Sequence, residues 1–351
     1  MGIEVPRQRH VPLVQIYGDT FEPEQPPSDD RPWMDDRAPA TFPVVLGLVP
    51  HDDVRLRFRR IALPPDIPVR IVSRNPSVVQ VAEPAGGLIS SGDAEIRLTT
   101  GEPLSTGSEP AGDADNDVGI AVQCAGKMIH GISARVYELL RVPVHPVAVQ
   151  VTPDGEILAG ARATIPGIDD IEQGVNRYFR RIGVQMVFGE IQNVAVTGLY
   201  GRFRVIGPPY PELESAIRQA HHPNKLNLYF SRTFSAPNDS GVVVEDRTIL
   251  GRYVSDTSRD NIVVKIEERP SSRLLSTIAH EIGHYFNLHH PMEHRSGTSI
   301  PASSGWFLMH WTSPGGRLIP LKWVTRHGAH RLLESQASAM RQTIRGRTWS
   351  L

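Results

Sequence analysis

After residue 41, short apolar runs alternate with turn-forming residues over about one hundred positions. Apolar side chains recur at every second position in residues 54–58 and 96–98, and further apolar runs lie within 71–81 and 120–122. Pro, Gly, Asn and Asp separate these runs and mark the turns between them. Several short strands joined by turns are typical of an all-β sandwich, so residues 41–142 are predicted to form such a domain.

The hydrophobic pattern changes near Val142. Beyond it, strand-like runs alternate with helical spacing, as in the predicted helix 169–181, where Ile171, Val175 and Phe179 recur every four positions. Strands are expected at 147–151, 184–196, 226–230, 248–254 and 262–266, and further helices at 211–220, about 271–286 and about 320–341. Residues 143–351 are therefore predicted to form a mixed α/β domain, which makes the whole chain α+β.

The segment ahead of these two domains has a different composition. Residues 20–40 combine Pro with acidic residues and contain almost no aliphatic side chains. Such a segment buries too little apolar surface to repay the entropy of ordering. Residues 1–40 are expected to be a flexible N-terminal segment.

A short histidine-rich motif, HEIGHYFNLHH, occupies residues 280–290. The predicted helix that carries it begins after Ser271 or Ser272, either of which can cap the first turn. On a helix, His280 and His284 are one turn apart and project from one face, where two imidazoles can bind one zinc ion. Glu281 lies on the neighbouring flank, close enough to act as a general base.

A catalytic zinc needs a third protein ligand and an open position for water. His290 can supply that ligand if the chain reverses soon after His284, which requires a residue that tolerates the left-handed conformation. Asn287 stands at that place, and Asn is the best residue other than Gly for it. His289 is the rival third ligand, although its spacing fits less well. A glutamate as the third ligand is disfavoured, because Glu293 is too near and Glu334 lies on the last predicted helix.

The resulting pattern, HExxHxxNxxH, resembles the metzincin signature HExxHxxGxxH, and SGWFLMHW around Met309 resembles the Met-turn of that family. The order of predicted elements over 143–351 is also similar. The resemblance implies a zinc metalloendopeptidase with Zn²⁺ held by His280, His284 and His290, above a hydrophobic floor formed by Met309. Trp311 stands where some members carry a metal-approaching tyrosine, so that role is not transferred.

The same resemblance implies a mechanism and a substrate position. Zinc and Glu281 would activate water, and Glu281 would pass the proton to the leaving amine. In metzincins the substrate lies extended along an edge strand. Residues 249–253 are the candidate edge, with four residues expected to bind the substrate: Leu250, Gly251, Arg252 and Tyr253.

Charge and composition limit the classes of binding partner that we expect. The net charge of −1 gives no global field that favours nucleic acid, and no stretch of 18 apolar residues favours membrane insertion. The expected partner is therefore a protein or peptide substrate, and the chain is expected to be a monomer. The single cysteine, Cys124, excludes an intramolecular disulfide and is expected in a buried strand. An extracellular location, in a signal-less or processed form, is favoured over a cytoplasmic one.

A second resemblance concerns the predicted sandwich. SRNPSVVQV at 73–81, followed by Gly86-Gly87 and Ala94-Glu95-Ile96, is similar to the strand-turn-strand signature of bacterial Ig-like modules. It implies a domain for docking, adhesion or latency. The alternative function for the whole chain is a protein-binding, adhesin-like module with an inactive or structural zinc site.

Overall fold

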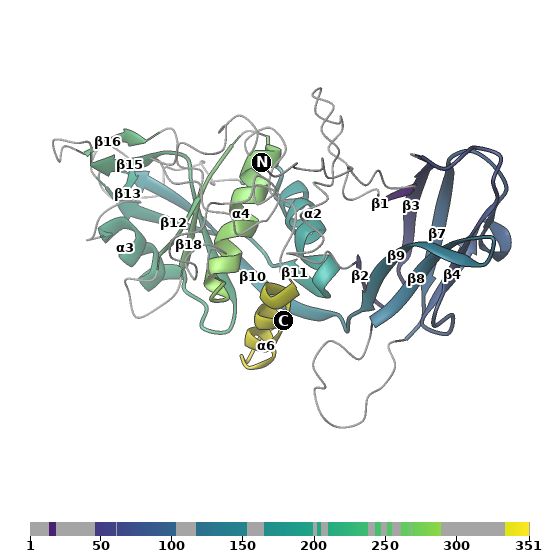
Figure 1. Cartoon of the computed structure of the whole chain (residues 1–351). Helices are drawn as coiled ribbons and strands as arrows, with labels where there is room; N and C mark the ends of the chain where they lie inside the picture. Colours follow the sequence, from purple (N-terminus) through teal and green to yellow (C-terminus); the bar gives the residue numbers. More distant parts are fainter. Residues whose placement is uncertain are drawn as a thin grey trace, which may run out of the picture. The chain divides into compact units, whose positions relative to one another are not determined.

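The chain folds into two compact units (Figure 1). Unit 1 comprises Met1–Leu139 with Arg180–Gly183, and unit 2 comprises Leu140–Phe179 with Val184–Leu351. The structure, a computed structural model, describes residues 14–18, 46–60, 62–102, 117–152, 165–198, 202–204, 210–237, 243–246, 251–254, 261–267, 269–288 and 334–350. Strands predominate and helices are few, so the fold is of the mixed α+β type.

Unit 1 consists of two β-sheets. The four-stranded sheet has the order β1-β3-β7-β5, and the five-stranded sheet has the order β2-β9-β8-β4-β6. The first contains β1 (Val14–Gly18), β3 (Asp53–Arg60), β7 (Ala94–Thr100) and β5 (Val79–Glu83). The second contains β2 (Leu46–Leu48), β9 (Lys127–Val136), β8 (Asp117–Cys124), β4 (Val69–Ser73) and β6 (Leu88–Ile89).

The two sheets of unit 1 share one apolar core. Leu56 and Phe58 of β3 and Leu98 of β7 belong to the same buried cluster as Ile71 of β4 and Val122 of β8. Intervening positions of β3 are exposed, as the alternating pattern predicts for a strand with one face buried. Cys124 ends β8 as a partly buried free thiol rather than a fully buried one.

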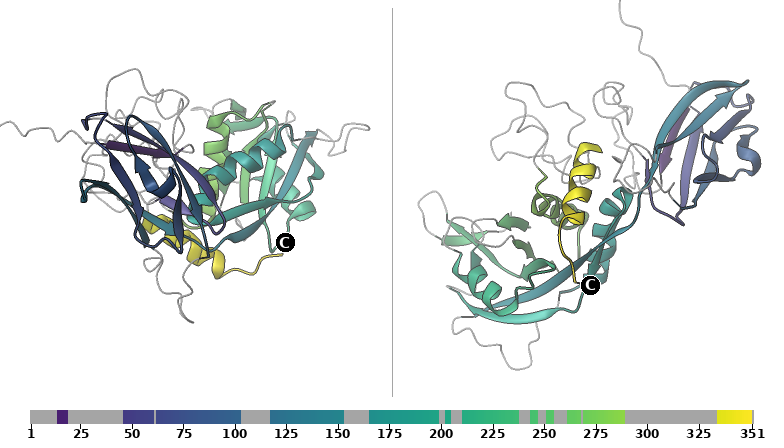
Figure 2. Two further views of the ribbon diagram at one scale, coloured as in Figure 1. Left: turned by 90° about the vertical axis from the view of Figure 1, so that its right-hand side faces the viewer. Right: turned by 90° about the horizontal axis from the view of Figure 1, so that it is seen from below.

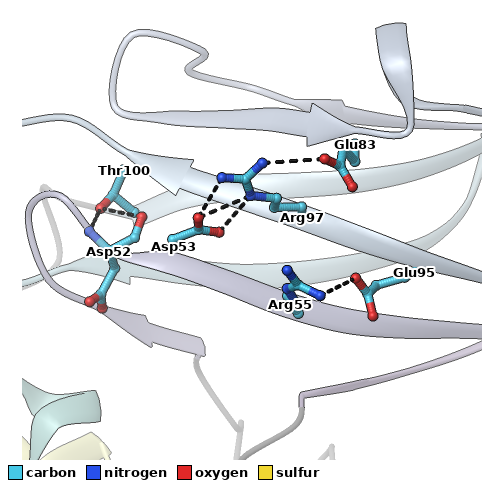
Figure 3. Close-up of polar contacts among 7 residues, drawn as sticks. All are labelled: Asp52, Asp53, Arg55, Glu83, Glu95, Arg97 and Thr100. Carbon is cyan, nitrogen blue, oxygen red and sulfur yellow. Dashed lines mark hydrogen bonds and ion pairs between the residues drawn. The ribbon is translucent and has the colours of Figure 1, made fainter.

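Charged side chains pair across neighbouring strands of the four-stranded sheet (Figure 3). The guanidinium of Arg97 donates to both carboxylate oxygens of Asp53, at 2.6–3.0 Å, and to Glu83 at 3.2 Å, while Arg55 donates to Glu95 at 3.1 Å. The hydrogen bonds from Arg97 lower the pKa of Asp53. Because these pairs are solvent-exposed, they contribute little to stability.

The main sheet of unit 2 has the order β11-β10-β14-β18-β17, and β12 pairs with β10 beyond the end of β11. All pairings are parallel except that between β17 and β18. The strands are β10 (Leu140–Thr152), β11 (Val184–Phe188), β12 (Gln192–Thr197), β14 (Leu226–Ser231), β17 (Gly251–Val254) and β18 (Asn261–Lys265). A small second sheet contains β13 (Phe203–Arg204), β15 (Phe234–Pro237) and β16 (Val243–Asp246).

Helices cover both faces of the main sheet. Helix α3 (Pro211–Ala220) packs on one face, where its apolar side chains form a core with Val147, Tyr229 and Val254. Val254 of β17 faces α3, so Gly251 and Tyr253, which alternate with it along the strand, face the opposite side. Both contact α4 (Ser272–Tyr285), and α4 therefore lies on the other face of the sheet. Helices α2 (Ile168–Phe179) and α6 (Glu334–Arg345) complete the unit: α2 packs against α4, and α6 (yellow in Figure 2) lies against β10.

The sequence predictions differ from the structure at element boundaries and in several strands that were not predicted, and the run expected as one strand at 184–196 forms two, β11 and β12. Strand β10 begins at Leu140, ahead of the expected start at 147, because Pro143 and Pro146 are accommodated within it. The predicted domain boundary at 142/143 accordingly falls inside β10. Residues 14–18, within the segment expected to be flexible, form β1, whereas residues 20–40 lie outside the described residues. Helix α6 is described only from Glu334, later than the expected start near 320.

Among the described residues, no helix is both long enough and apolar enough to cross a membrane.

A buried turn in unit 1 provides a test of its packing. Gly87 has φ +68°, and a Cβ there would lie 2.1 Å from the carbonyl oxygen of Ile71. Gly87→Ala should therefore lower the free energy of unfolding by about 2–5 kcal/mol, combining left-handed strain with a backbone clash. Chemical denaturation followed by fluorescence measures the change.

The matched control is Gly92→Ala. Gly92 has φ +65°, but a Cβ added there would meet no atom within 4 Å, so only the left-handed strain of about 1–2 kcal/mol applies. Equal losses in the two variants would contradict the packing described around Gly87.

Candidate metal centre

Helix α4, which carries the candidate metal ligands, begins where the sequence predicts. The Ser271 hydroxyl accepts a hydrogen bond of 3.1 Å from the backbone N–H of Leu274, which confirms Ser271 as the N-cap. Leu274, Ile278 and Ile282 are buried along one stripe. Leu275 packs against α2 at Gly174, where an added Cβ would lie 2.5 Å from its side chain. These contacts fix the helix and leave its other face for polar side chains.

The rings of His280 and His284 converge on one point. Their Nε2 atoms are 3.1 Å apart, and the rings are nearly perpendicular, with centroids separated by 4.7 Å. Two nitrogens bound tetrahedrally to zinc at about 2.0–2.1 Å would lie about 3.3 Å apart. The observed separation therefore suits two ligands of a single zinc ion.

A backbone carbonyl orients the second of these rings. His284 Nδ1 lies 3.0 Å from the carbonyl oxygen of Leu288. Because a carbonyl oxygen can only accept, Nδ1 must carry the proton, and the neutral ring then has a lone pair on Nε2. Outer contacts of this kind are what fix the tautomer of metal-binding histidines.

The side chain of Glu281 connects α4 to β17. Its Oε2 accepts a hydrogen bond of 2.7 Å from the backbone N–H of Tyr253. Removal of its carboxyl from water raises the pKa of Glu281, and this effect is opposed by electrostatic interaction with His284, by the hydrogen bond from the Tyr253 N–H and by Arg252. The carboxylate therefore has a defined position beside the two imidazoles.

Strand β17 is an edge strand of the main sheet as described, and it approaches α4 closely. At Gly251 a Cβ would lie 3.1 Å from Thr277 and 3.7 Å from Glu281, so a larger residue there would press on the helix. The Tyr253 ring stacks on the His284 ring, with centroids 6.3 Å apart. Arg252 alternates to the other face of the strand, and Leu250 lies outside the described residues.

The carboxyl end of α4 closes in a left-handed turn. Asn287 has φ +61°, as the sequence predicts. The N–H of Leu288 bonds to the carbonyl of Gly283 at 3.0 Å, and the N–H of Asn287 bonds to that of His284 at 2.9 Å. These two bonds form a Schellman motif, with the side chain of Leu288 buried behind it. The helix therefore stops within three residues of His284.

The remaining predicted site residues, His290 and Met309, lie outside the described residues, as do His289 and Trp311. Within the described part of the chain, no group of three or more His, Cys, Asp or Glu side chains is arranged to hold a metal ion. The structure brings together His280, Glu281 and His284, with Asn287 at the turn. Sequence reasoning missed two contacts, those of Glu281 with Tyr253 N–H and of His284 with Leu288, because residue types carry no signal for backbone partners.

Comparison with known proteins adds little to this geometry. No family model matches the chain, and no curated protein matches it. One matching solved structure is described as a novel carbohydrate acetylesterase from Xanthomonas citri, with 9% sequence identity and a TM-score of 0.18. The match covers 54% of this chain and about half (51%) of that one, and its low score supports no statement on fold or function.

Asn287 allows a direct test of the helix end. Its side chain is exposed, so substitutions there change backbone preference more than packing. Asn287→Ala should destabilise unit 2 by about 1 kcal/mol because Ala resists positive φ, whereas Asn287→Gly should stay within about 0.5 kcal/mol of the wild type. Urea denaturation measures both. An Ala variant as stable as the Gly variant would argue against the left-handed turn.

Proposed function

We propose that this protein is a zinc-dependent endopeptidase of the metzincin type, with Zn²⁺ bound by His280, His284 and His290. The supporting observation is the convergence of the His280 and His284 Nε2 atoms at 3.1 Å, with the His284 ring oriented by a carbonyl. The left-handed Asn287 directly after this helix supplies the reversal that a third ligand at 290 requires.

When bound, zinc would supply a Lewis acid that polarises the scissile carbonyl and lowers the pKa of water. The protein's own contribution is the placement of Glu281, one residue from His280 and hydrogen-bonded to Tyr253 N–H. A carboxylate fixed in this way accepts a proton from the attacking water and then donates it to the leaving amine. In this role Glu281 acts on the water and is not itself a metal ligand.

The proposed substrate is an extended peptide beside β17. Glu281 accepts from the N–H of Tyr253, which places the main-chain groups of residue 253 on the side of β17 away from β18. Gly251, two residues earlier, presents its groups in the same direction. A peptide added along this edge through main-chain groups other than the Tyr253 N–H, which Glu281 already occupies, would run past Glu281 and the histidine pair. Leu250, Gly251, Arg252 and Tyr253 remain the proposed substrate-binding residues.

Strand order supports the proposed family relationships. In unit 2 the strand β17, antiparallel to its neighbour β18, comes before the histidine-bearing helix α4 in the sequence. Helix α6 comes after α4. For unit 1 we propose an Ig-like module. If the strands β1, β3, β4, β5, β7, β8 and β9 are lettered A to G, the two sheets read A-B-E-D and G-F-C, which is the immunoglobulin order.

Replacing Glu281 tests the proposed reaction. Glu281→Gln keeps an oxygen for the Tyr253 N–H but cannot take up a proton, so kcat should fall about 10²–10⁴-fold while zinc content is unchanged. Cleavage products of a mixed peptide library, mapped by mass spectrometry with and without a hydroxamate, measure the activity. Full activity in the Gln variant would refute the role of Glu281, and a wild-type protein that binds zinc but cleaves nothing would favour a binding module.

The third ligand is tested by metal analysis. His290→Ala should lower the affinity for zinc by at least about tenfold, because two imidazoles alone form an incomplete site. His289→Ala, its neighbour, is the matched control and should retain the wild-type zinc content. The reverse outcome would transfer the ligand role to His289.

A further inference from the structure

The C-terminal tail of the chain folds back onto the carboxyl end of α4. The guanidinium carbon of Arg347 lies 4.5 Å from the centroid of the Tyr285 ring and 5.6 Å from that of Phe286. One of its nitrogens donates to the carbonyl oxygen of Tyr285 at 3.3 Å. A residue near the end of the chain therefore contacts the last turn of the histidine-bearing helix.

Arg347 completes the hydrogen bonding of that helix end. A helix leaves its last carbonyls without partners inside the helix. The Schellman motif supplies donors to the carbonyls of Gly283 and His284, and Arg347 supplies one to the next carbonyl, that of Tyr285. Its positive charge is also favourable beside the negative end of the helix dipole.

Other contacts hold the tail in place. The Trp349 ring lies 6.1 Å from that of Phe286, and its Nε1 donates to the carbonyl of Ile344 at 2.9 Å. The backbone N–H of Ser350 bonds to the carbonyl of Asn224, ahead of β14, at 3.1 Å. Within α6, Met340 and Ile344 are buried. Arg347 is thus fixed on both sides, which lets it fix α4 in turn.

We propose that Arg347 is a positioning residue for the metal centre, acting through the helix end on the orientation of His284. The path consists of two contacts joined by a backbone turn. Arg347 holds the carbonyl of Tyr285, the turn at Asn287 follows within two residues, and the next carbonyl, that of Leu288, orients the His284 ring through Nδ1. Loosening the first contact allows the turn to move, and the ring that depends on it loses its fixed partner.

The test replaces Arg347 and measures zinc affinity, so it rests on the proposed metal site. Arg347→Ala should weaken zinc binding about tenfold, as loss of outer contacts to metal ligands does. Arg347→Lys keeps the charge but cannot stack a planar group on both rings, so its affinity should fall in between. Arg345→Ala, an exposed arginine two residues earlier, is the control and should bind as the wild type does. Competition with a chromophoric chelator gives the affinities.

A second readout needs no zinc. In the metal-free protein, amide hydrogen exchange in the peptide covering residues 284–288 should accelerate in Arg347→Ala and not in Arg345→Ala. Wild-type zinc affinity or wild-type exchange in a folded Arg347→Ala protein would overturn the proposal, even if its melting temperature fell. If Arg347→Ala does not fold, Arg347→Lys decides in the same way.

These readouts separate the two proposals. If the wild-type protein binds zinc and the double variant His280→Ala/His284→Ala binds it equally well, the proposed function is refuted. The exchange measurement on the metal-free protein would still decide whether Arg347 fixes the helix end.

Discussion

The candidate site depends on where one helix stops. If α4 continued past Phe286, the carbonyl of Leu288 would point along the helix axis, away from the ring of His284. The left-handed conformation of Asn287 turns the chain back, so that the carbonyl lies 3.0 Å from His284 Nδ1. The orientation of a side chain that we propose as a metal ligand therefore follows from one backbone dihedral angle three residues later.

The features of this site that the sequence predicted are local. The Ser271 cap, the apolar stripe of α4 and the positive φ of Asn287 each depend on residues within one or two turns, and all three are found in the structure. The bounds of α3 were also predicted correctly, because Pro at its start and apolar spacing mark it clearly. Local patterns of this kind are what side-chain periodicity and capping preferences encode.

The features that the sequence did not predict involve distant or backbone partners. Tyr253 and Glu281 are 28 residues apart, and Arg347 and Tyr285 are 62 apart, so no periodicity links them. The prediction for β10 was too short because proline usually interrupts a strand, whereas this strand contains Pro143 and Pro146. Strand β9 was not predicted because His130 and Gly131 interrupt its apolar pattern. In each case tertiary pairing outweighs the local preference.

The bond between Glu281 and Tyr253 has a consequence for how the folded chain behaves in concentrated solution. Strands at the margin of a sheet carry backbone groups that can template pairing with other molecules, which leads to aggregation. The carboxylate of Glu281 occupies one such donor on β17 and places a negative charge beside it. The residue whose chemistry we propose to be hydrolytic thus also takes up one of the backbone donors through which this sheet margin could pair with another chain.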